Sequence, residues 1–471
     1  MLIDETIAAP ATLMNAPAAI GIIRITGGRS AEIISSIIVN KDAAPLFAGG
    51  RAAVKPRYMY HGFIISPGEN ARPVDEVMVC FYKSPASYTG EDMAEIFCHG
   101  GSYNMYRTLG AVLKAGARPA GPGEFTKRAC INAKMDLCQA EAVCDIINSR
   151  TSTLHQIAIS QIKGSLSYEI NAVKNQLVAV IADIEANLDF PEEDIDPVDI
   201  AAVRKTLLDC RHKTFLLLAS YDYGRIIREG LKITIAGSPN VGKSSLFNLL
   251  LRHDRAIVTE IPGTTRDVIE ETVNIEGAAF TIADTAGVRE ADDVVEKIGI
   301  ERTYENIRGA DLCLVVLDAS RPVNDEDIRL LTETKTAARA VVINKIDNMS
   351  PAFSYNCIPL KETETAVEIS VKENTNIDTL KTLILKKSGA LSASLQHNAD
   401  RAIITNARHA ACLENTLASL DDAVKTIDSH CPIDLLTIDI RAALSSLGEI
   451  VGETVTDDIL HKIFEKFCIG K

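Results

Sequence analysis

The sequence predicts a multidomain protein of α/β and α class, in which a small α+β domain precedes an α-helical domain that carries an inserted α/β domain. Three patterns support this. A strand, a glycine loop and a helix follow one another within residues 231–250. Apolar residues keep helical spacing before this unit, over 134–189, and after it, over 402–447. The chain has 471 residues, which is enough for two or three domains.

The composition argues against several classes of protein. A formal net charge of −14 does not suit a generally basic nucleic-acid binder, so a nucleic-acid partner would need a local patch or a second protein. The 11 cysteines are scattered and form no C-x-x-C pair, which argues against a zinc or disulfide framework. No apolar stretch is long enough to span a bilayer, and residues 1–17 lack the basic region of a secretory signal. We therefore expect a cytoplasmic protein with no membrane partner.

Residues 1–123 are expected to form the compact α+β domain. Arg24 and Glu95 are charged residues within two of its apolar predicted strands. The common reason for such a charge is exposure at a sheet edge, and the alternative is contact with a ligand. Strands are predicted at 20–26, 74–82 and 93–99, and helices at 30–38 and 102–115.

Helical patterns dominate the segments on both sides of residues 231–387. The acidic, proline-bounded stretch 190–197 breaks the first segment and is interpreted as a solvated loop. Because both flanks are helical, we infer that residues 124–230 and 388–471 form one helical domain around the insertion; two separate helical domains are the alternative. The helices are predicted at 134–189, 198–220, 402–423, 433–447 and 457–467.

The inserted domain begins with an apolar strand, Leu231–Ala236, which runs into a complete G-x-x-x-x-G-K-S sequence, Gly237–Ser244. Its two glycines let the backbone curl so that successive N–H groups face one centre, and the following helix adds positive charge there. Lys243 is expected to reach the β- and γ-phosphates of a nucleotide, and Ser244 to bind Mg²⁺. The residues expected to hold the phosphates are Asn240, Val241, Gly242, Lys243, Ser244 and Ser245.

A second sequence indicates which base is bound. Residues 344–347 read N-K-x-D after an apolar strand, which is the guanine-binding pattern of Ras-type GTPases. Asp347 would accept hydrogen bonds from N1–H and the 2-amino group of guanine, and adenine lacks both donors. Asn344 and Lys345 are expected to brace this loop, and Ser370 to lie in the last loop that contacts the base. We therefore expect the insertion to be a Ras-like P-loop GTPase domain.

Two further segments complete the predicted nucleotide site. Asp284 and Gly287 belong to a D-T-A-G sequence that follows a predicted strand. Asp284 would hold Mg²⁺, and the Gly287 N–H would meet the γ-phosphate. Thr265, within G-T-T-R-D, would bind Mg²⁺ when γ-phosphate is present.

The position that usually orients the attacking water is altered. Ras-type enzymes carry Gln directly after D-x-x-G, whereas this chain has Val288, whose apolar side chain cannot do this. The candidates are the acidic residues within 289–296. Positive charge at the transition state must then come from an arginine in trans or from a monovalent cation, which Asn240 could hold together with carbonyls of the loop 259–264.

Several segments outside the nucleotide motifs are similar to one known family. They are T-I-A-A-P-A-T, S-Y-T-G-E-D, P-G-E-F-T-K-R-A, N-A-K-M-D-L-C-Q-A-E-A, I-G-I-E-R and the final C-I-G-K. Together with G-S-P-N-V-G-K-S and P-G-T-T-R-D, they resemble the tRNA-modification GTPase family MnmE, also called TrmE, over essentially the whole chain. One departure is the segment 13–19, L-M-N-A-P-A-A, where members of this family usually have a glycine-rich loop.

This resemblance implies a tetrahydrofolate-binding N-terminal domain through which two chains dimerise, and a K⁺-activated GTPase whose G domains pair across the dimer. It implies that Glu296 orients the attacking water and that Cys468 is a functional thiol, for which an inert terminal residue is the alternative. The implied Mg²⁺ ligands are Ser244 and Thr265, and the implied K⁺ ligands are Asn240, Thr259, Ile261 and Thr264. The implied contacts to a folate, in its 5-formyl or methylene form, are Arg24, Glu95, Lys134 and Lys471.

The same resemblance implies a heterotetramer with an FAD-dependent partner, MnmG, that acts on tRNA. The implied reaction adds an aminomethyl or carboxymethylaminomethyl group to C5 of the wobble uridine, with the folate as one-carbon donor. The alternative is a ribosome-assembly or other regulatory GTPase, which also carries P-N-x-G-K-S and P-G-T-T-R-D. Such a switch is expected to carry a basic RNA-binding module, whereas this acidic chain has helical flanks and C-I-G-K, so we prefer tRNA modification.

Overall fold

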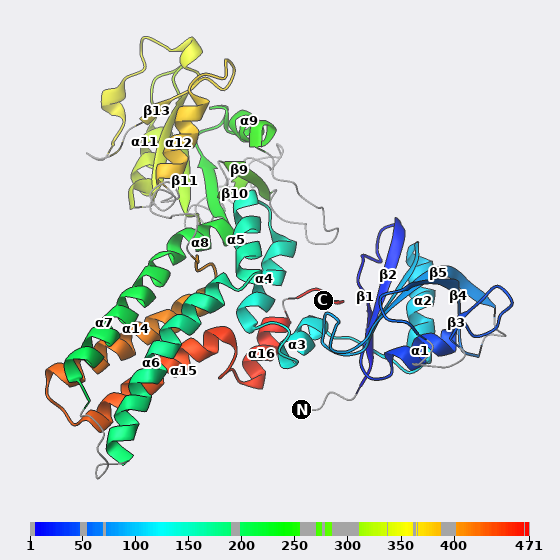
Figure 1. The fold of residues 1–471 in the computed structure, drawn as a ribbon. Helices are drawn as coiled ribbons and strands as arrows, with labels where there is room; N and C mark the ends of the chain where they lie inside the picture. Colours follow the sequence, from blue (N-terminus) through cyan, green and yellow to red (C-terminus); the bar gives the residue numbers. More distant parts are fainter. Residues whose placement is uncertain are drawn as a thin grey trace. The chain divides into compact units, whose positions relative to one another are not determined.

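The computed structural model divides into two compact units, Met1–Cys144 with Gly448–Lys471, and Asp145–Leu447 (Figure 1). It describes residues 5–47, 54–68, 72–189, 198–254, 270–275, 278–284, 310–336, 338–360, 364, 366–387, 402–465 and 467–470. Within these residues, no helix combines the length and the apolar character that crossing a membrane requires.

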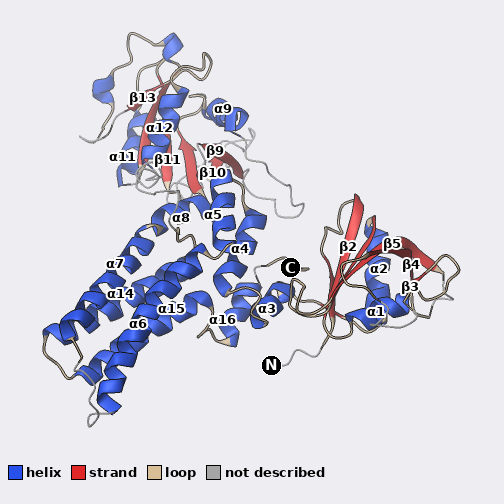
Figure 2. Cartoon of the chain, viewed as in Figure 1, coloured by secondary structure: helices blue, strands red, loops and turns tan. Residues whose placement is uncertain are grey.

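The first unit is built on a seven-stranded sheet with the order β3-β4-β5-β6-β2-β1-β7. Neighbouring strands are antiparallel except β1 and β7, which run parallel. Helices α1 (Ser30–Ile37) and α2 (Ser102–Lys114) pack together on one face (Figure 2). The strands are β1 (Ile7–Pro10), β2 (Ala18–Thr26), β3 (Ile38–Val39), β4 (Met59–Ile65), β5 (Pro73–Tyr82), β6 (Met93–Gly100) and β7 (Arg118–Pro119).

Alternation along β2 decides which side chains reach the core. Ile23 and Ile25 are fully buried under the two helices, whereas Ile22 and Arg24 lie on the opposite face and are half-buried. This period of two is the pattern that predicted the strand. The other strands and helices predicted for this region are also confirmed, with ends that differ by at most two residues.

The last residues of the chain belong to this first unit. Leu137 and Ala140 of α4 (Leu137–Asn148) form a buried apolar cluster with Phe464 and Phe467. Phe464 ends the helix α16 (Asp457–Phe464), which lies beside α3 (Glu124–Ile131). The two ends of the chain therefore come together in one unit, although the sequence separates them by more than 300 residues.

Helices that precede and follow the central sheet in sequence pack together in the second unit. Helices α7 (Ile200–Ala219) and α14 (Ala407–Asp428) lie side by side. They are joined by the ion pairs Arg204–Asp428, at 2.8 Å, and Arg211–Asp421, at 2.5 Å. Further described helices are α5 (Ser152–Ile162), α6 (Ser165–Asp189), α8 (Tyr221–Glu229) and α15 (Ile433–Val451).

The sheet of the second unit has six strands in the order β13-β12-β11-β8-β10-β9. Neighbouring strands are parallel except the edge pair β10 and β9. Helices α9 (Lys243–Asp254) and α12 (Ile377–Lys387) pack on one face and α11 (Asp325–Glu333) on the other, which explains why the central strands are apolar throughout. The strands are β8 (Leu231–Ala236), β9 (Glu270–Ile275), β10 (Ala278–Asp284), β11 (Leu312–Asp318), β12 (Arg339–Asn344) and β13 (Ala366–Glu368).

Candidate functional site

The glycine loop begins where the central strand β8 ends and closes where α9 begins, as predicted. Strand β8 lies between β11 and β10, so the loop emerges at the carboxyl edge of the parallel strands, where ligands of such sheets bind. Two loop residues have left-handed backbone conformations, Asn240 with φ 60° and Gly242 with φ 100°. Asparagine and glycine are residues that adopt this region at low cost. The loop sequence therefore suits the curl that it adopts.

Lys243 lies across the inside of this loop. Its Nζ donates hydrogen bonds to the carbonyl oxygens of Gly237, at 2.8 Å, and Ser238, at 2.9 Å. Ser244 and Ser245 are exposed in the first turn of α9, where backbone N–H groups and the helix dipole favour an anion. The ammonium group and the helix start thus lie at the same end of the loop, as phosphate binding requires.

Asn344 joins the predicted guanine loop to the glycine loop. Its buried Nδ2 donates to the carbonyl of Val241 at 2.9 Å, and its Oδ1 accepts from the N–H of Val371 at 3.2 Å. The approach is so close that a Cβ atom at Gly242 would collide with Asn344 Nδ2. The second glycine of the motif is therefore required by packing as well as by its backbone angle.

Lys345 makes a second bridge between the same two loops. Its Nζ donates to the carbonyl of Asn240 and to Oδ2 of Asp318, each at 2.7 Å. Asp318 ends strand β11 and also accepts from the N–H and hydroxyl of Ser320. Burial alone would raise the pKa of the Asp318 carboxyl, but the hydrogen bonds from Lys345 and Ser320 outweigh it and lower that pKa. Asp318 therefore stays ionised as the counter-charge of Lys345.

Asp347 is exposed and is oriented by a neighbour. The buried Ser370 donates its hydroxyl to Asp347 Oδ1 at 2.6 Å and accepts a hydrogen bond from the N–H of Glu373 at 3.1 Å. The structure thus brings Asn344, Lys345, Asp347 and Ser370 together beside the glycine loop. Asp318 was not among the predicted residues, although its place at the end of an apolar parallel strand could have indicated it.

Of the remaining predicted nucleotide and metal residues, the structure describes Asp284 and leaves the others outside the described residues. Asp284 ends β10, and its backbone pairs in register with Ile235 of β8, which puts it at the same edge of the sheet. Among the described residues, no group of three His, Cys, Asp or Glu side chains is arranged to hold a metal ion. The predicted residues Thr259, Ile261, Thr264, Thr265, Gly287 and Glu296 lie outside the described residues.

The first unit has its own polar site on the face of the sheet that α1 and α2 leave open. Arg24 and Glu95 are directly opposite in β2 and β6, and Arg24 Nε and Nη2 donate to Glu95 Oε1 at 3.0 and 2.8 Å. Their side chains are 18% and 12% exposed, so the pair is sheltered but can be reached from solvent. The Arg24 guanidinium also lies over the rings of Tyr88, at 5.6 Å, and Phe125, at 5.8 Å.

Tyr82 is a third member of the Arg24–Glu95 site, and the sequence analysis did not identify it. Its hydroxyl donates to Glu95 Oε2 at 3.0 Å. Burial, Cys80 and Glu95 together raise the pKa of Tyr82 well above its ordinary value, so the hydroxyl remains a donor. Lys134, in contrast, donates to the carbonyl of Pro85 at 3.1 Å, and its side chain is exposed. Both oxygens of Glu95 are thus held in place by groups from neighbouring strands.

The C-terminal C-I-G-K sequence reaches the same site. The carbonyl of Gly470 accepts a hydrogen bond from Arg24 Nη1 at 3.2 Å, and the carbonyl of the exposed Cys468 accepts from the N–H of Gly123 at 3.4 Å. Gly470 has φ 93°, and a Cβ there would collide with the carbonyl oxygen of Pro10. Only glycine fits this position, which explains the glycine of the terminal motif. Lys471 lies outside the described residues.

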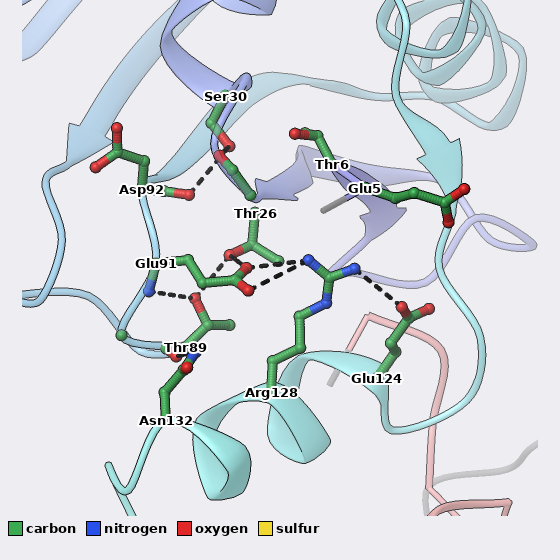
Figure 3. Close-up of polar contacts among 12 residues, drawn as sticks. Glu5, Thr6, Thr26, Ser30, Thr89, Glu91, Asp92, Glu124, Arg128 and Asn132 are labelled. Carbon is green, nitrogen blue, oxygen red and sulfur yellow. Dashed lines mark hydrogen bonds and ion pairs between the residues drawn. The ribbon is translucent and has the colours of Figure 1, made fainter. Parts of the chain in front are cut away.

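A buried arginine connects two further segments that carry the family resemblance. In Figure 3, Arg128 lies between Glu91 and Glu124, to which its Nη1 and Nη2 donate, each at 3.1 Å. The Arg128 side chain has no exposed surface. Glu91 also accepts from Thr26 at 2.9 Å, and the hydroxyls of Thr26 and Thr89 are 2.6 Å apart. This network therefore fastens the S-Y-T-G-E-D loop to the helix that begins with P-G-E-F-T-K-R-A.

Glu124 is the most strongly held carboxylate of this network. Burial acts to raise its pKa, but hydrogen bonds from Arg118, from the N–H of Gly121 and from Arg128 lower it to about 2. Arg118 contributes two of these bonds, at 2.9 and 2.6 Å. The carboxylate therefore stays charged at neutral pH, and the start of α3 is fixed beside the polar site of the first unit.

Comparison with known proteins covers the whole chain. The family model described as "GTP-binding protein TrmE N-terminus" matches residues 6–134, and the one described as "MnmE helical domain" matches residues 137–468. The "tRNA modification GTPase MnmE" of Alkaliphilus metalliredigens (strain QYMF) is 41% identical over 473 residues, and that of Clostridioides difficile (strain 630) is 39% identical over 471 residues. Each alignment covers 100% of both chains.

Solved structures match about a third of this chain. A crystal structure of Era with MgGDPNP and a 16S ribosomal RNA segment is 32% identical over 33% of this chain and 56% of that one, with a TM-score of 0.26. The G domain of the T. maritima iron transporter FeoB is 25% identical over 34% of this chain and 98% of that one, with a TM-score of 0.24. The two family models and the full-length relatives, taken with the arrangement of the two sites, establish that this chain belongs to the MnmE (TrmE) family of tRNA modification GTPases.

Proposed function

We propose that this chain is the GTP-hydrolysing subunit of a cytoplasmic complex that adds an aminomethyl or carboxymethylaminomethyl group to C5 of the wobble uridine of tRNA. Membership of the family over the full chain supports the role in tRNA modification. One observation supports the proposed binding of GTP. The glycine loop, Asn344, Lys345 and the Asp347–Ser370 pair lie together at one edge of the sheet. The proposed partners are a second copy of the chain, an FAD-dependent MnmG subunit in a heterotetramer, and tRNA.

Guanine recognition follows from the orientation of Asp347. Ser370 occupies one side of the carboxylate, and the carboxylate can accept two hydrogen bonds from N1–H and the 2-amino group of guanine. Adenine offers neither donor, and it would leave the carboxylate without a partner. A site built to hydrogen-bond such donors rejects an analogue that lacks them by about 10⁴-fold. The proposed substrate is therefore GTP rather than ATP.

Metal ions complete the proposed hydrolytic site. A bound Mg²⁺ would supply positive charge against the charge that develops during phosphoryl transfer. Ser244, at the start of α9, and Thr265 are its proposed ligands, and Asp284 would hold it from β10. The side-chain oxygen of Asn240, an exposed residue of the glycine loop, is a proposed K⁺ ligand. Carbonyls of Thr259, Ile261 and Thr264 are the further proposed K⁺ ligands, and Glu296 is proposed to orient the water.

The Arg24–Glu95 pair is proposed to bind a tetrahydrofolate derivative. A pteridine ring presents an amino group and a ring N–H on one edge, which suit a fixed carboxylate such as Glu95. Tyr88 adds partly exposed aromatic surface beside Arg24, where a flat ring can pack. The carbonyl of Gly470 accepts a hydrogen bond from Arg24, so Cys468 and Lys471 are proposed to act at this site as well. Lys134 is the remaining proposed folate contact.

A second copy of the chain is proposed to cover the open face of the N-terminal sheet. The strand register aligns Ile22, Phe97 and Met78 in one row across β2, β6 and β5. On this face Ile20, Met59 and Met78 are 58%, 45% and 37% exposed. Apolar side chains gathered on an open sheet mark a surface that another protein covers. The G domains of the two copies are proposed to pair during GTP hydrolysis.

The proposal is tested by mass spectrometry of tRNA nucleosides from cells that lack this chain. We expect C5-modified wobble uridine to disappear and to return when the wild-type chain is supplied. A Lys243→Ala chain should fail to restore it, because Lys243 is needed at the phosphates. A matched surface variant, Lys425→Ala on α14, should restore it fully. An unchanged nucleoside profile in the deletion strain would remove the modification role and favour a regulatory GTPase.

A further inference from the structure

A serine inside the glycine loop makes a contact that phosphate binding does not require. The hydroxyl of Ser238 donates to Asp327 Oδ1 at 2.6 Å. Ser238 is 3% exposed and Asp327 is 2% exposed, so water does not compete for this bond. Asp327 lies in the first turn of α11, on the face of the sheet opposite α9. The predicted nucleotide motifs include neither the Ser238 side chain nor any residue of α11.

Asp327 is itself held by four further hydrogen bonds, with the two residues Arg321 and Asn324. Arg321 donates from Nη1 to Oδ2 at 2.8 Å and from Nη2 to Oδ1 at 3.2 Å. The N–H of Asn324 donates to Oδ2 at 3.2 Å, and Asn324 Oδ1 accepts from the Asp327 N–H at 2.8 Å, which completes a capping box. A carboxylate with its charge balanced and its backbone capped is a rigid anchor.

The backbone of the anchored Ser238 also contacts Lys243. The backbone carbonyl of Ser238 accepts one of the hydrogen bonds of Lys243, at 2.9 Å. Two residues further along, the carbonyl of Asn240 is held by Lys345, which pairs with Asp318. Asp318 and Asp327 lie at the two ends of the same connection between β11 and α11. This connection therefore supports the glycine loop at two points.

We propose that Ser238 and Asp327 are positioning residues for nucleotide binding, which hold the glycine loop in the curl that presents its N–H groups to the phosphates. We expect neither side chain to contact the nucleotide. Because the N–H groups of the loop face phosphates that GTP and GDP share, loosening the loop weakens the binding of both nucleotides. Interactions equal in ground and transition states change KM and leave kcat in place.

The test is the Ser238→Ala variant of the full-length chain, titrated with GTP and GDP. If the loop keeps its binding conformation in about a tenth of the molecules, both dissociation constants rise about tenfold. The KM for GTP should rise by the same factor, while kcat at saturating GTP stays within about twofold. Arg321→Met, which frees Asp327 without touching the loop, should weaken both nucleotides by a smaller factor. The double variant should lose less than the product of the two single losses, because both act through Asp327.

A matched control separates positioning from general stability. Ser220 is also a buried serine with two hydrogen bonds, to the Leu217 carbonyl and from the Ile404 N–H, and it lies among the helices. Ser220→Ala should lower the melting temperature about as much as Ser238→Ala and leave nucleotide affinity unchanged. The inference is overturned if Ser238→Ala melts earlier yet binds GTP and GDP as wild type does. A loss of kcat with unchanged affinity, or a loss for GTP alone, would overturn it too.

Discussion

Replacing Asp347 by Asn tests the guanine site atom by atom. Ser370 donates its hydroxyl to Asp347 Oδ1 at 2.6 Å, so the atom at this position must be an acceptor. In the variant, the amide keeps its oxygen toward Ser370 and turns its NH₂ group to the position of Oδ2. The N1–H and 2-amino groups of guanine then meet a donor instead of an acceptor. We therefore expect guanine nucleotides to bind much more weakly.

The size of the loss follows from the bonds removed. Each hydrogen bond to a charged acceptor contributes about 1.5–3 kcal/mol. Two such bonds contribute ~3–6 kcal/mol, which corresponds to a factor of ~10²–10⁴ in affinity. Asp347 is exposed, so solvent compensates part of this energy and the lower end applies. The expected increase in the GDP dissociation constant is about 10²–10³-fold.

The assay is competition of GDP and XDP against a fluorescent guanine nucleotide for the wild type and an equivalent xanthine probe for the variant. Xanthine carries an oxygen at C2, to which the NH₂ group of the substituted side chain can donate, so the variant should prefer XDP. Adding Ser370→Ala frees the amide to rotate, and part of this preference should disappear. A folded Asp347→Asn chain that binds GDP within threefold of wild type (about 0.7 kcal/mol) would refute the assignment of Asp347 to the base.

Four further outcomes are expected. Asp318→Asn should remove a part of the folding stability that acid also removes. The pKa of Asp318 is lowered in the fold. Its contribution to the stability is therefore present above the ordinary carboxyl pKa of ~3.9 and is lost as the pH falls below that value. Thermal melts from pH 7 to pH 3 should show this loss in wild type and less of it in the variant. GTP turnover in KCl should exceed that in NaCl at equal ionic strength, and equal rates would remove the K⁺ proposal. Glu296→Ala should slow hydrolysis by about 10²-fold or more with GTP affinity retained, measured by single turnover, and unchanged turnover would exclude its role. Deleting residues 468–471 removes the Gly470 carbonyl from Arg24, and should abolish tRNA modification while GTP turnover continues; intact modification would make the terminal thiol and Lys471 dispensable.

Local sequence was enough to predict most elements and the nucleotide loop. The alternation of Ile22, Ile23, Arg24 and Ile25 predicted a strand with one buried face, and the structure confirms it. The step from apolar strand to glycine loop to helix at residues 231–250 is likewise a local pattern, because each hydrogen bond of Lys243 within the loop joins residues close in sequence. The N-K-x-D residues were predicted for the same reason, since they follow directly from the end of β12.

The residues that hold these motifs in place through distant contacts could not be predicted from local patterns. Asp318, Asp327 and Tyr82 look like ordinary polar residues at the ends of strands and at a helix start, and their roles depend on partners 13–89 residues away. Arg128 resembles a surface charge in a short helix, yet its side chain is wholly buried between two carboxylates.

The sequence alone predicted the coarse fold class, the order of the elements and the residues that we propose to meet guanine and phosphate. These depend on side-chain periodicity and backbone preferences, which act within a few residues. The tertiary structure alone decided that Ser238 is tied to α11, that Lys345 rests on Asp318, and that Gly470 reaches Arg24, 446 residues earlier in the chain. Burial turns such distant pairs into specific contacts, because a buried polar group must find a partner, and only the packed chain determines which partner is near.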